Sequence, residues 1–161
     1  MRATTSDGGV ASAAEATAEQ ADAGAQSAFS IGLSTTACTG RCPIFDLKLN
    51  QSGEVELHGR GNTRQQGWVG KMVPAETATE LLDAIVAADY WELTDRYIEE
   101  ADGCTELDPE QTTYTWSVRT DGPTKIVIDF QGCKGVPEVE ALRAIPALLI
   151  DQLELERWLG L

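Results

Sequence analysis

The chain has 161 residues, of which 42% are hydrophobic and 24% charged, so its length and composition suit one folded domain. The formal net charge of −14 and the pI of about 4.3 argue against nucleic acid or an anionic membrane surface as a partner, because both require clustered Lys and Arg. No apolar run approaches the ~18 residues of a membrane span.

The first 28 residues are mostly Ala, Thr, Ser, Gly, Glu, Asp and Gln, with no aromatic residue. Such a segment cannot bury enough apolar surface to offset an ordering cost of roughly 1–2 kcal/mol per residue. We predict a disordered linker over 1–28, with a short Ala-rich helix over 11–25 as the alternative. The segment lacks the apolar core of a signal peptide. It is similar to the spacer after the anchor cysteine of a bacterial lipoprotein, which suggests a lipid anchor upstream.

Residues 29–161 are predicted to form a single domain that begins with strands. Apolar and polar side chains alternate over 29–34, over 44–50 and again from Val55, and each run predicts a strand. A fourth strand, which contains Trp68, is predicted over 65–73. Gln51-Ser52-Gly53 is a turn that joins the second and third runs into a hairpin.

A helix and a second hairpin follow. Pro74 suits a helix start, and apolar residues recur at helical spacing until about Asp89. The segment 90–97 is predicted to be irregular and the acidic segment 99–110 to be a loop. The second hairpin is predicted from the β-branched runs 112–120 and 125–130.

The last predicted region is helical, and it determines the expected fold class. It starts after Pro137, and Pro146 is expected to kink or break it, because proline removes a backbone hydrogen bond. The whole pattern predicts an α+β fold, in which two hairpins and an N-terminal strand form a mostly antiparallel sheet. The helices are expected on one face, because alternating strands have one apolar face to cover.

Four cysteines are the most informative residues for the compartment, and they allow three disulfide connectivities. We favour Cys38–Cys42, which flanks a tight turn at Gly40, and Cys104–Cys133, which links the acidic loop to the end of the second hairpin. A zinc site made by all four thiolates and free or redox-active thiols are the alternatives. Local disulfides indicate an oxidising compartment, so we expect a periplasmic or cell-surface location.

Other candidate functional residues are few. The single histidine, His58, is expected on the polar side of a strand with no catalytic partner near it in sequence. Carboxylates crowd one loop, and these are Glu99, Glu100, Asp102, Glu106, Asp108 and Glu110. They lack the regular spacing of a calcium-binding hand, so a solvated acidic loop is favoured over a metal or acid–base site. No cofactor is predicted. The Trp and Tyr residues are assigned mainly to the core and its margins.

Several blocks of the chain, in the same order, resemble a bacterial family of domains of unknown function, number 6438. These blocks are Cys38-Thr39-Gly40-Arg41-Cys42-Pro43, the helix end Ala88-Asp89-Tyr90-Trp91, Asp108 near a typical Thr-Asp block, Gly132-Cys133-Lys134-Gly135-Val136-Pro137, and Trp158. The resemblance covers about 29–158. It implies an exported or lipid-anchored bacterial protein and supports the Cys104–Cys133 pair, but it implies no activity or catalytic residue.

These observations favour a non-enzymatic extracytoplasmic domain that binds a protein or a small ligand or has a structural role. The first alternative is a thiol–disulfide exchange protein that uses Cys38 and Cys42, which requires an accessible thiol of low pKa. The second is a carboxylate or metal site in the 99–110 loop.

Overall fold

The computed structural model describes residues 28–161, so the predicted linker lies, apart from Ala28, outside the described residues. In chain order the strands are β1 (Ser30–Thr35), β2 (Ile44–Asn50), β3 (Glu54–Gly61), β4 (Gly67–Met72), β5 (Arg96–Tyr97), β6 (Glu106–Leu107), β7 (Thr113–Arg119), β8 (Lys125–Phe130) and β9 (Cys133–Lys134). The α-helices are α2 (Ala75–Ala87), α3 (Glu140–Arg143), α4 (Ile145–Gln152) and α5 (Glu156–Leu159). Short 3-10 helices are η1 (Tyr90–Glu92), η2 (Glu100–Asp102) and η3 (Pro137–Val139).

Most of the strands belong to one sheet. Within the described residues it has seven strands in the order β4-β3-β2-β1-β7-β8-β5, and β6 and β9 form a separate two-stranded sheet. Every pair in the large sheet is antiparallel except β5–β8. The α+β fold with a mostly antiparallel sheet, predicted from the alternation, is therefore confirmed.

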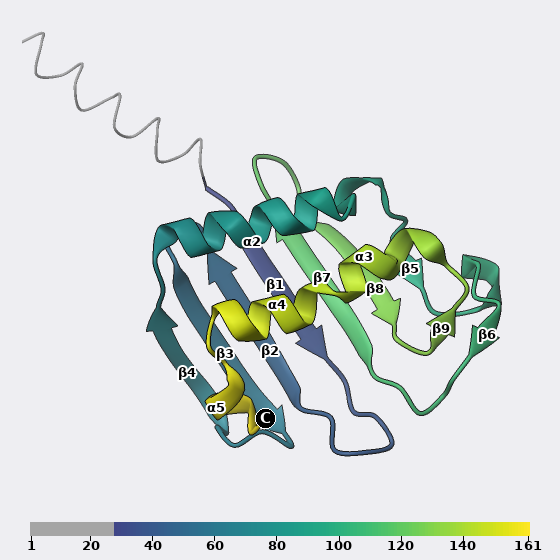
Figure 1. The fold of residues 1–161 in the computed structure, drawn as a ribbon, viewed down its shortest axis with the longest axis horizontal. Helices are drawn as coiled ribbons and strands as arrows, with labels where there is room; N and C mark the ends of the chain where they lie inside the picture. The colour runs from purple at the N-terminus through teal and green to yellow at the C-terminus, as the bar shows by residue number, and fades with distance from the viewer. Residues whose placement is uncertain (1–27) are drawn as a thin grey trace, which may run out of the picture.

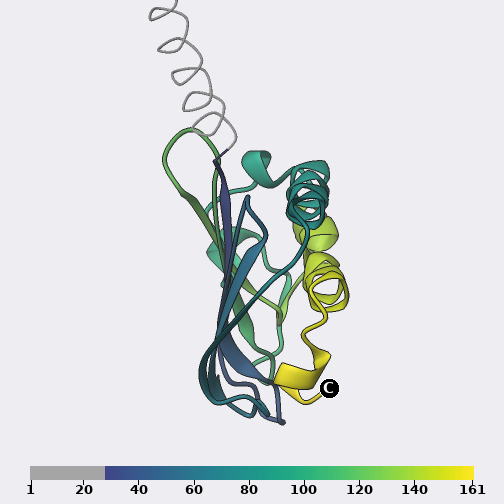
Figure 2. The same cartoon turned by 90° about the vertical axis from the view of Figure 1, so that its left-hand side faces the viewer.

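The helices cover one face of the large sheet, as predicted (Figures 1 and 2). Alternate strand residues point to this face, and the largest of them, Trp116, is completely buried. Helix α2 contributes Leu81 and Ile85 to the same core, and α4 contributes Leu149. Within the described residues, no helix lies on the opposite face of the sheet (Figure 2).

The C-terminal helical region is broken where the proline predicted a break. Helix α3 ends at Arg143 and α4 begins at Ile145, with Pro146 in the first turn of α4. Proline is tolerated there because a first-turn N–H has no partner within the helix.

Helix α3 is fixed to the sheet by a buried ion pair. Asp129 of β8 accepts hydrogen bonds from Nη2 (2.6 Å) and Nε (2.9 Å) of Arg143. Gln131 donates to the same carboxylate at 2.8 Å, and Arg143 also donates to the Phe130 carbonyl. The Asp129 side chain is 1% exposed. Both charges are thus removed from water and satisfied by each other and by neighbouring polar groups.

Two segments differ from the sequence-based expectation. The segment 90–97, predicted to be irregular, contains η1 and the strand β5, which pairs in parallel with Ile128 and Asp129 of β8. The acidic segment 99–110, predicted to be a loop, contains η2 and the strand β6, which pairs with β9. Strands of two residues show no alternation in sequence, and their partners are distant along the chain.

Candidate functional site

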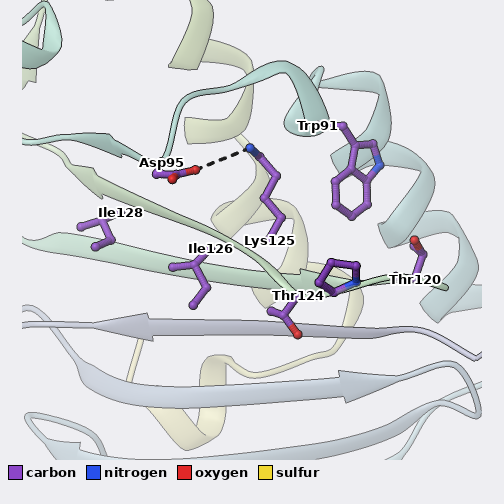
Figure 3. A pocket seen from close by; sticks show the side chains of 9 residues that line it. Trp91, Asp95, Thr120, Thr124, Lys125, Ile126 and Ile128 are labelled. Atoms are coloured by element: carbon purple, nitrogen blue, oxygen red, sulfur yellow. Dashed lines mark ion pairs between the residues drawn. The ribbon is translucent and has the colours of Figure 1, made fainter.

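A shallow groove of about 650 Å³ lies beside β8, at the end of the β7–β8 hairpin. Figure 3 shows its side chains. It is lined by Trp91, Asp95, Thr120, Gly122, Pro123, Thr124, Lys125, Ile126 and Ile128. Its volume is within the range of small-molecule sites, roughly 300–1,000 Å³.

The apolar wall of the groove is exposed because of the chain path after α2. Asp89 adopts a left-handed conformation (φ 60°) and turns the chain into η1. Tyr90 then points into the core, so its neighbour Trp91 must point outward, and the two rings meet edge-to-face with centroids 5.4 Å apart. Trp91 is 37% exposed and Ile126 of β8 is 48% exposed. Two large apolar side chains thus face solvent on the same groove.

Tyr90 anchors this wall to the sheet. Its hydroxyl donates a 2.7 Å hydrogen bond to the carbonyl oxygen of Lys125 in β8. Burial raises the pKa of Tyr90, and the negative charge of Asp95 raises it further, so the phenol stays protonated and keeps donating. The segment that carries Trp91 is therefore held at a fixed distance from β8.

The polar side of the groove is an ion pair. Nζ of Lys125 donates to the carbonyl oxygen of Leu93 at 2.7 Å and lies 3.8 Å from Oδ1 of Asp95 (Figure 3). The Lys125 side chain is largely buried, whereas that of Asp95 is 87% exposed. The ammonium is thus already partnered, and the carboxylate at the rim is the group with free hydrogen-bonding capacity.

The backbone of β8 adds one further recognition element. In an antiparallel pair, alternate residues direct their peptide groups toward and away from the partner strand. Gln131 N donates to Thr112 O, so odd-numbered residues of β8 face β7 and even-numbered residues face the other side. Ile128 N is taken by Asp95 O, but Ile126 lies beyond the end of β5. The Ile126 peptide group therefore faces the groove.

Both disulfides favoured from the sequence are present, and they lie in different environments. Cys104–Cys133 has Cα atoms 5.0 Å apart and is buried in the core, whereas Cys38–Cys42 is half-buried at the surface. All four cysteines are thereby bonded, so the structure has neither a zinc site made by the four thiolates nor a free thiol. A core disulfide indicates an oxidising, extracytoplasmic location.

Five residues of the family blocks, Gly40, Pro43, Asp108, Gly132 and Pro137, lie near the disulfides in sequence, whereas Trp91 of another block lines the groove. Asp108 N donates to Gly132 O at 2.9 Å, and a Cβ added at Gly132 would lie 2.1 Å from the carbonyl oxygen of Asp108. Pro43 accepts a 2.8 Å hydrogen bond from the buried Thr35, and Pro137 begins η3. Gly40 lies in the turn between Cys38 and Cys42. None of these five residues lines the groove.

His58 has neighbours that its sequence context did not reveal. It lies opposite Asp46 of β2 and Trp68 of β4, with Nδ1 3.5 Å from Oδ2 of Asp46 and its ring stacked on Trp68 at 4.5 Å. Partial burial would raise the pKa of Asp46, but hydrogen bonds from Ser34 and Arg60 lower it below its ordinary value. Asp46 thus lies between the serine and the imidazole. This order does not activate a nucleophile, because the base must contact the hydroxyl.

The acidic loop uses its carboxylates to fix its own backbone. Asp102 accepts a 2.9 Å hydrogen bond from Ile98 N and another from Arg96 Nε, and Arg96 also pairs with Glu99. The backbone bond from Ile98 is the main reason that the pKa of Asp102 is lowered. Within residues 28–161, no three His, Cys, Asp or Glu side chains gather in a way that could hold a metal ion.

The groove was the part of the site that sequence reasoning missed. The available signal was the pair Tyr90-Trp91, since two adjacent aromatic residues on one strand or turn cannot both enter the same core. The assignment of aromatic residues to the core holds for Trp116, Tyr90 and Tyr97, but Trp68 and Trp91 are exposed.

Comparison with known proteins places the chain in a family. In the part of the chain described, no helix has the length and apolar character needed to cross a bilayer. Among curated proteins none matches the chain significantly. The family model described as Domain of unknown function (DUF6438) matches residues 29–146, which includes both disulfides and the groove. The chain therefore belongs to the DUF6438 family.

Proposed function

We propose that this domain is a non-enzymatic binding module of an exported bacterial protein, and that it holds its ligand in the groove beside Trp91. The observation that carries the proposal is the exposed wall of Trp91 and Ile126, which the Tyr90–Lys125 hydrogen bond holds against β8. Apolar surface rimmed by polar groups is typical of ligand-binding grooves.

The lining groups define the class of ligand. Trp91, Pro123 and Ile126 supply the apolar lining, while the Asp95 carboxylate and the Ile126 peptide group supply hydrogen bonds at its border. This combination suits a ligand with an apolar body and an amide or hydroxyl group, such as a short peptide or a small amphipathic molecule. Recognition is favoured over chemistry because Lys125 is already engaged by Leu93 and Asp95.

The two disulfides support a periplasmic or cell-surface location. The resemblance of residues 1–28 to a lipoprotein spacer supports attachment through an upstream lipid anchor. Differential alkylation of the protein in whole cells tests the compartment. We expect all four cysteines to be protected before reduction, and protection of fewer than four would contradict an oxidising location.

The binding proposal is tested by nuclear magnetic resonance with a library of small soluble fragments. The indole N–H resonances of the four tryptophans serve as separate reporters, and buried Trp116 reports unfolding. We expect fragment hits to shift Trp91 and the amides of Ile126 and Ile128. Trp91→Ala should abolish these hits, whereas Trp68→Ala, the same change at the opposite edge of the sheet, should not. Hits that bind Trp91→Ala equally well would overturn the proposal.

One observation favours thiol–disulfide exchange at Cys38 and Cys42 as a second candidate function. This disulfide is half-buried, while the other is in the core, and the exposed Arg41 lies inside its loop, where a cation would lower a thiol pKa. If exchange is the function, mild reduction followed by iodoacetamide must label Cys38 or Cys42 and leave the buried pair intact. If neither Cys38 nor Cys42 is labelled selectively, thiol–disulfide exchange is excluded.

A further inference from the structure

The outer edge of the large sheet is open along β4. Among residues 28–161, β4 pairs only with β3, and it lies at the border of the sheet in Figure 1. The other edge strand, β5, has only two residues, and Arg96 within it is tied to Glu99 and Asp102. The β5 edge is thus short and carries an Arg96 side chain held in ion pairs, whereas the β4 edge has six residues. Natural sheets usually protect long edges, because an open edge pairs with other chains.

The free peptide groups of β4 belong to its outward-facing residues. Val73 N donates to Gly53 O at 2.8 Å, and alternation along the pair then directs Val69 and Lys71 toward β3. Trp68, Gly70 and Met72 direct their N–H and C=O groups away from the sheet. The close stacking of Trp68 on His58 agrees, because pairs without mutual hydrogen bonds bring side chains closer.

The side chains of the same residues form a hollow. Trp68 and Met72 are each 64% exposed and stand on either side of Gly70, and the hollow between them has a volume of about 450 Å³. Gly70 has no side chain to fill it. The stack on His58 fixes the Trp68 ring in place. The hollow therefore accepts one side chain from a strand laid along β4.

The hollow is negatively charged. Glu54 and Glu56 of β3 line it and lie opposite Met72 and Gly70. Within residues 28–161 neither glutamate forms an ion pair with Lys or Arg, although Asn50 donates to Glu54. The cation on β4, Lys71, points to the other face, where it donates to Glu154 O and lies 5.0 Å from the centre of the Trp158 ring. Lys48 of β2 lies opposite Glu56 in the register, on the side away from β4, and does not line the hollow.

We propose that β4 pairs with an extended basic segment of a partner protein, which adds a strand to the sheet and places a Lys or Arg side chain in the hollow at Gly70. Backbone pairing supplies affinity and the hollow supplies specificity. The cation lies over Trp68 and beside two carboxylates, an arrangement that favours Lys or Arg over other side chains. A second copy of this chain is disfavoured as the occupant, because each copy carries a net charge of −14 and the same pair of glutamates.

The test uses an acetylated octapeptide of alternating Thr and Lys, titrated into the whole chain at low salt, with amide and indole resonances as the readout. We expect shifts at Trp68, Gly70 and Met72, no binding of the Thr–Glu counterpart, and weaker binding as salt is raised. Trp68→Ala should weaken binding about tenfold. Trp91→Ala, the matched change in the other groove, should leave it unchanged and so separates this proposal from the proposed function.

Backbone pairing is tested without changing the protein. The peptide is N-methylated either at all Lys or at all Thr positions, and only one of the two sets should abolish binding, because alternate residues face β4. Glu54→Gln combined with Glu56→Gln should also weaken binding at low salt. Equal effects of the two methylations, or full binding to Trp68→Ala, would overturn the proposal. Self-association of the chain through β4 without peptide would assign the edge to a second copy instead.

Discussion

The Asp129–Arg143 ion pair allows a quantitative test of how the C-terminal helices are held to the sheet. Asp129 is 1% exposed and Arg143 13% exposed, and the guanidinium contacts both carboxylate oxygens. Removing one partner leaves an uncompensated charge in the interior, which costs about 3–5 kcal/mol. We therefore expect Arg143→Met alone, and Asp129→Val alone, each to lower the free energy of unfolding by this amount. That is a large part of the ~5–15 kcal/mol typical of a domain.

The double variant distinguishes the loss of the Asp129–Arg143 ion pair from the cost of burying one unpaired charge. In Asp129→Val combined with Arg143→Met neither charge remains, so the cost should be smaller than that of either single change. The measurement is equilibrium unfolding in urea, followed by circular dichroism, for wild type, both single variants and the double variant. Single changes that each cost less than about 1 kcal/mol, or a double change that costs their sum, would refute the reasoning.

Three further predictions concern the disulfide-bonded end of the domain. Gly135→Ala should destabilise by about 1–3 kcal/mol, because Gly135 has φ +83° and a Cβ there would lie 2.1 Å from a threonine hydroxyl oxygen. Gly122→Ala, where no atom lies within 4 Å of the added Cβ, is the control and should leave the melting temperature unchanged. Changing both Cys104 and Cys133 to Ser opens a loop with a sequence separation of 29 and should cost about 3.5 kcal/mol in urea unfolding; a loss below about 1 kcal/mol would contradict this. The pKa of Asp102 is lower in the folded protein, so the stability that it contributes is complete above about pH 4 and is lost as the pH falls through its folded pKa. Asp102→Asn should flatten the acid limb of a pH–stability curve, and an unchanged limb would contradict the assignment.

The parts of the fold that local sequence determines were predictable. Alternation at Ile31 and Leu33, and again at Leu47 and Leu49, marks strands whose apolar residues all enter one core. Pro146 predicted the break between α3 and α4, because its effect on the backbone is local. The order of the strands in the sheet could not be predicted from local sequence. That β1 lies between β2 and β7 follows from long-range pairing, which no nearby residue encodes.

The candidate sites were less predictable because tertiary contacts create them. Trp91 faces solvent only because Tyr90 is bonded to Lys125, a residue on a distant strand. Likewise, His58 gains Asp46 and Trp68 as neighbours through strand register. Sequence reasoning located the cysteine pairs because residue spacing and turn chemistry constrain which cysteines can meet.

The position of β1 in the middle of the sheet has a consequence for how the chain folds. Its neighbour β2 follows after a short loop, so β1 to β4 can assemble as a local meander. Its other neighbour, β7, pairs Arg119 with Ser30 and is separated from β1 by α2 and the acidic segment. Closing so long a loop costs entropy before any contact is gained, so β1–β7 docking should set the folding rate. A chain that emerges from its N-terminus, at a ribosome or a translocon, therefore carries an unpaired β1 edge until Arg119 has emerged.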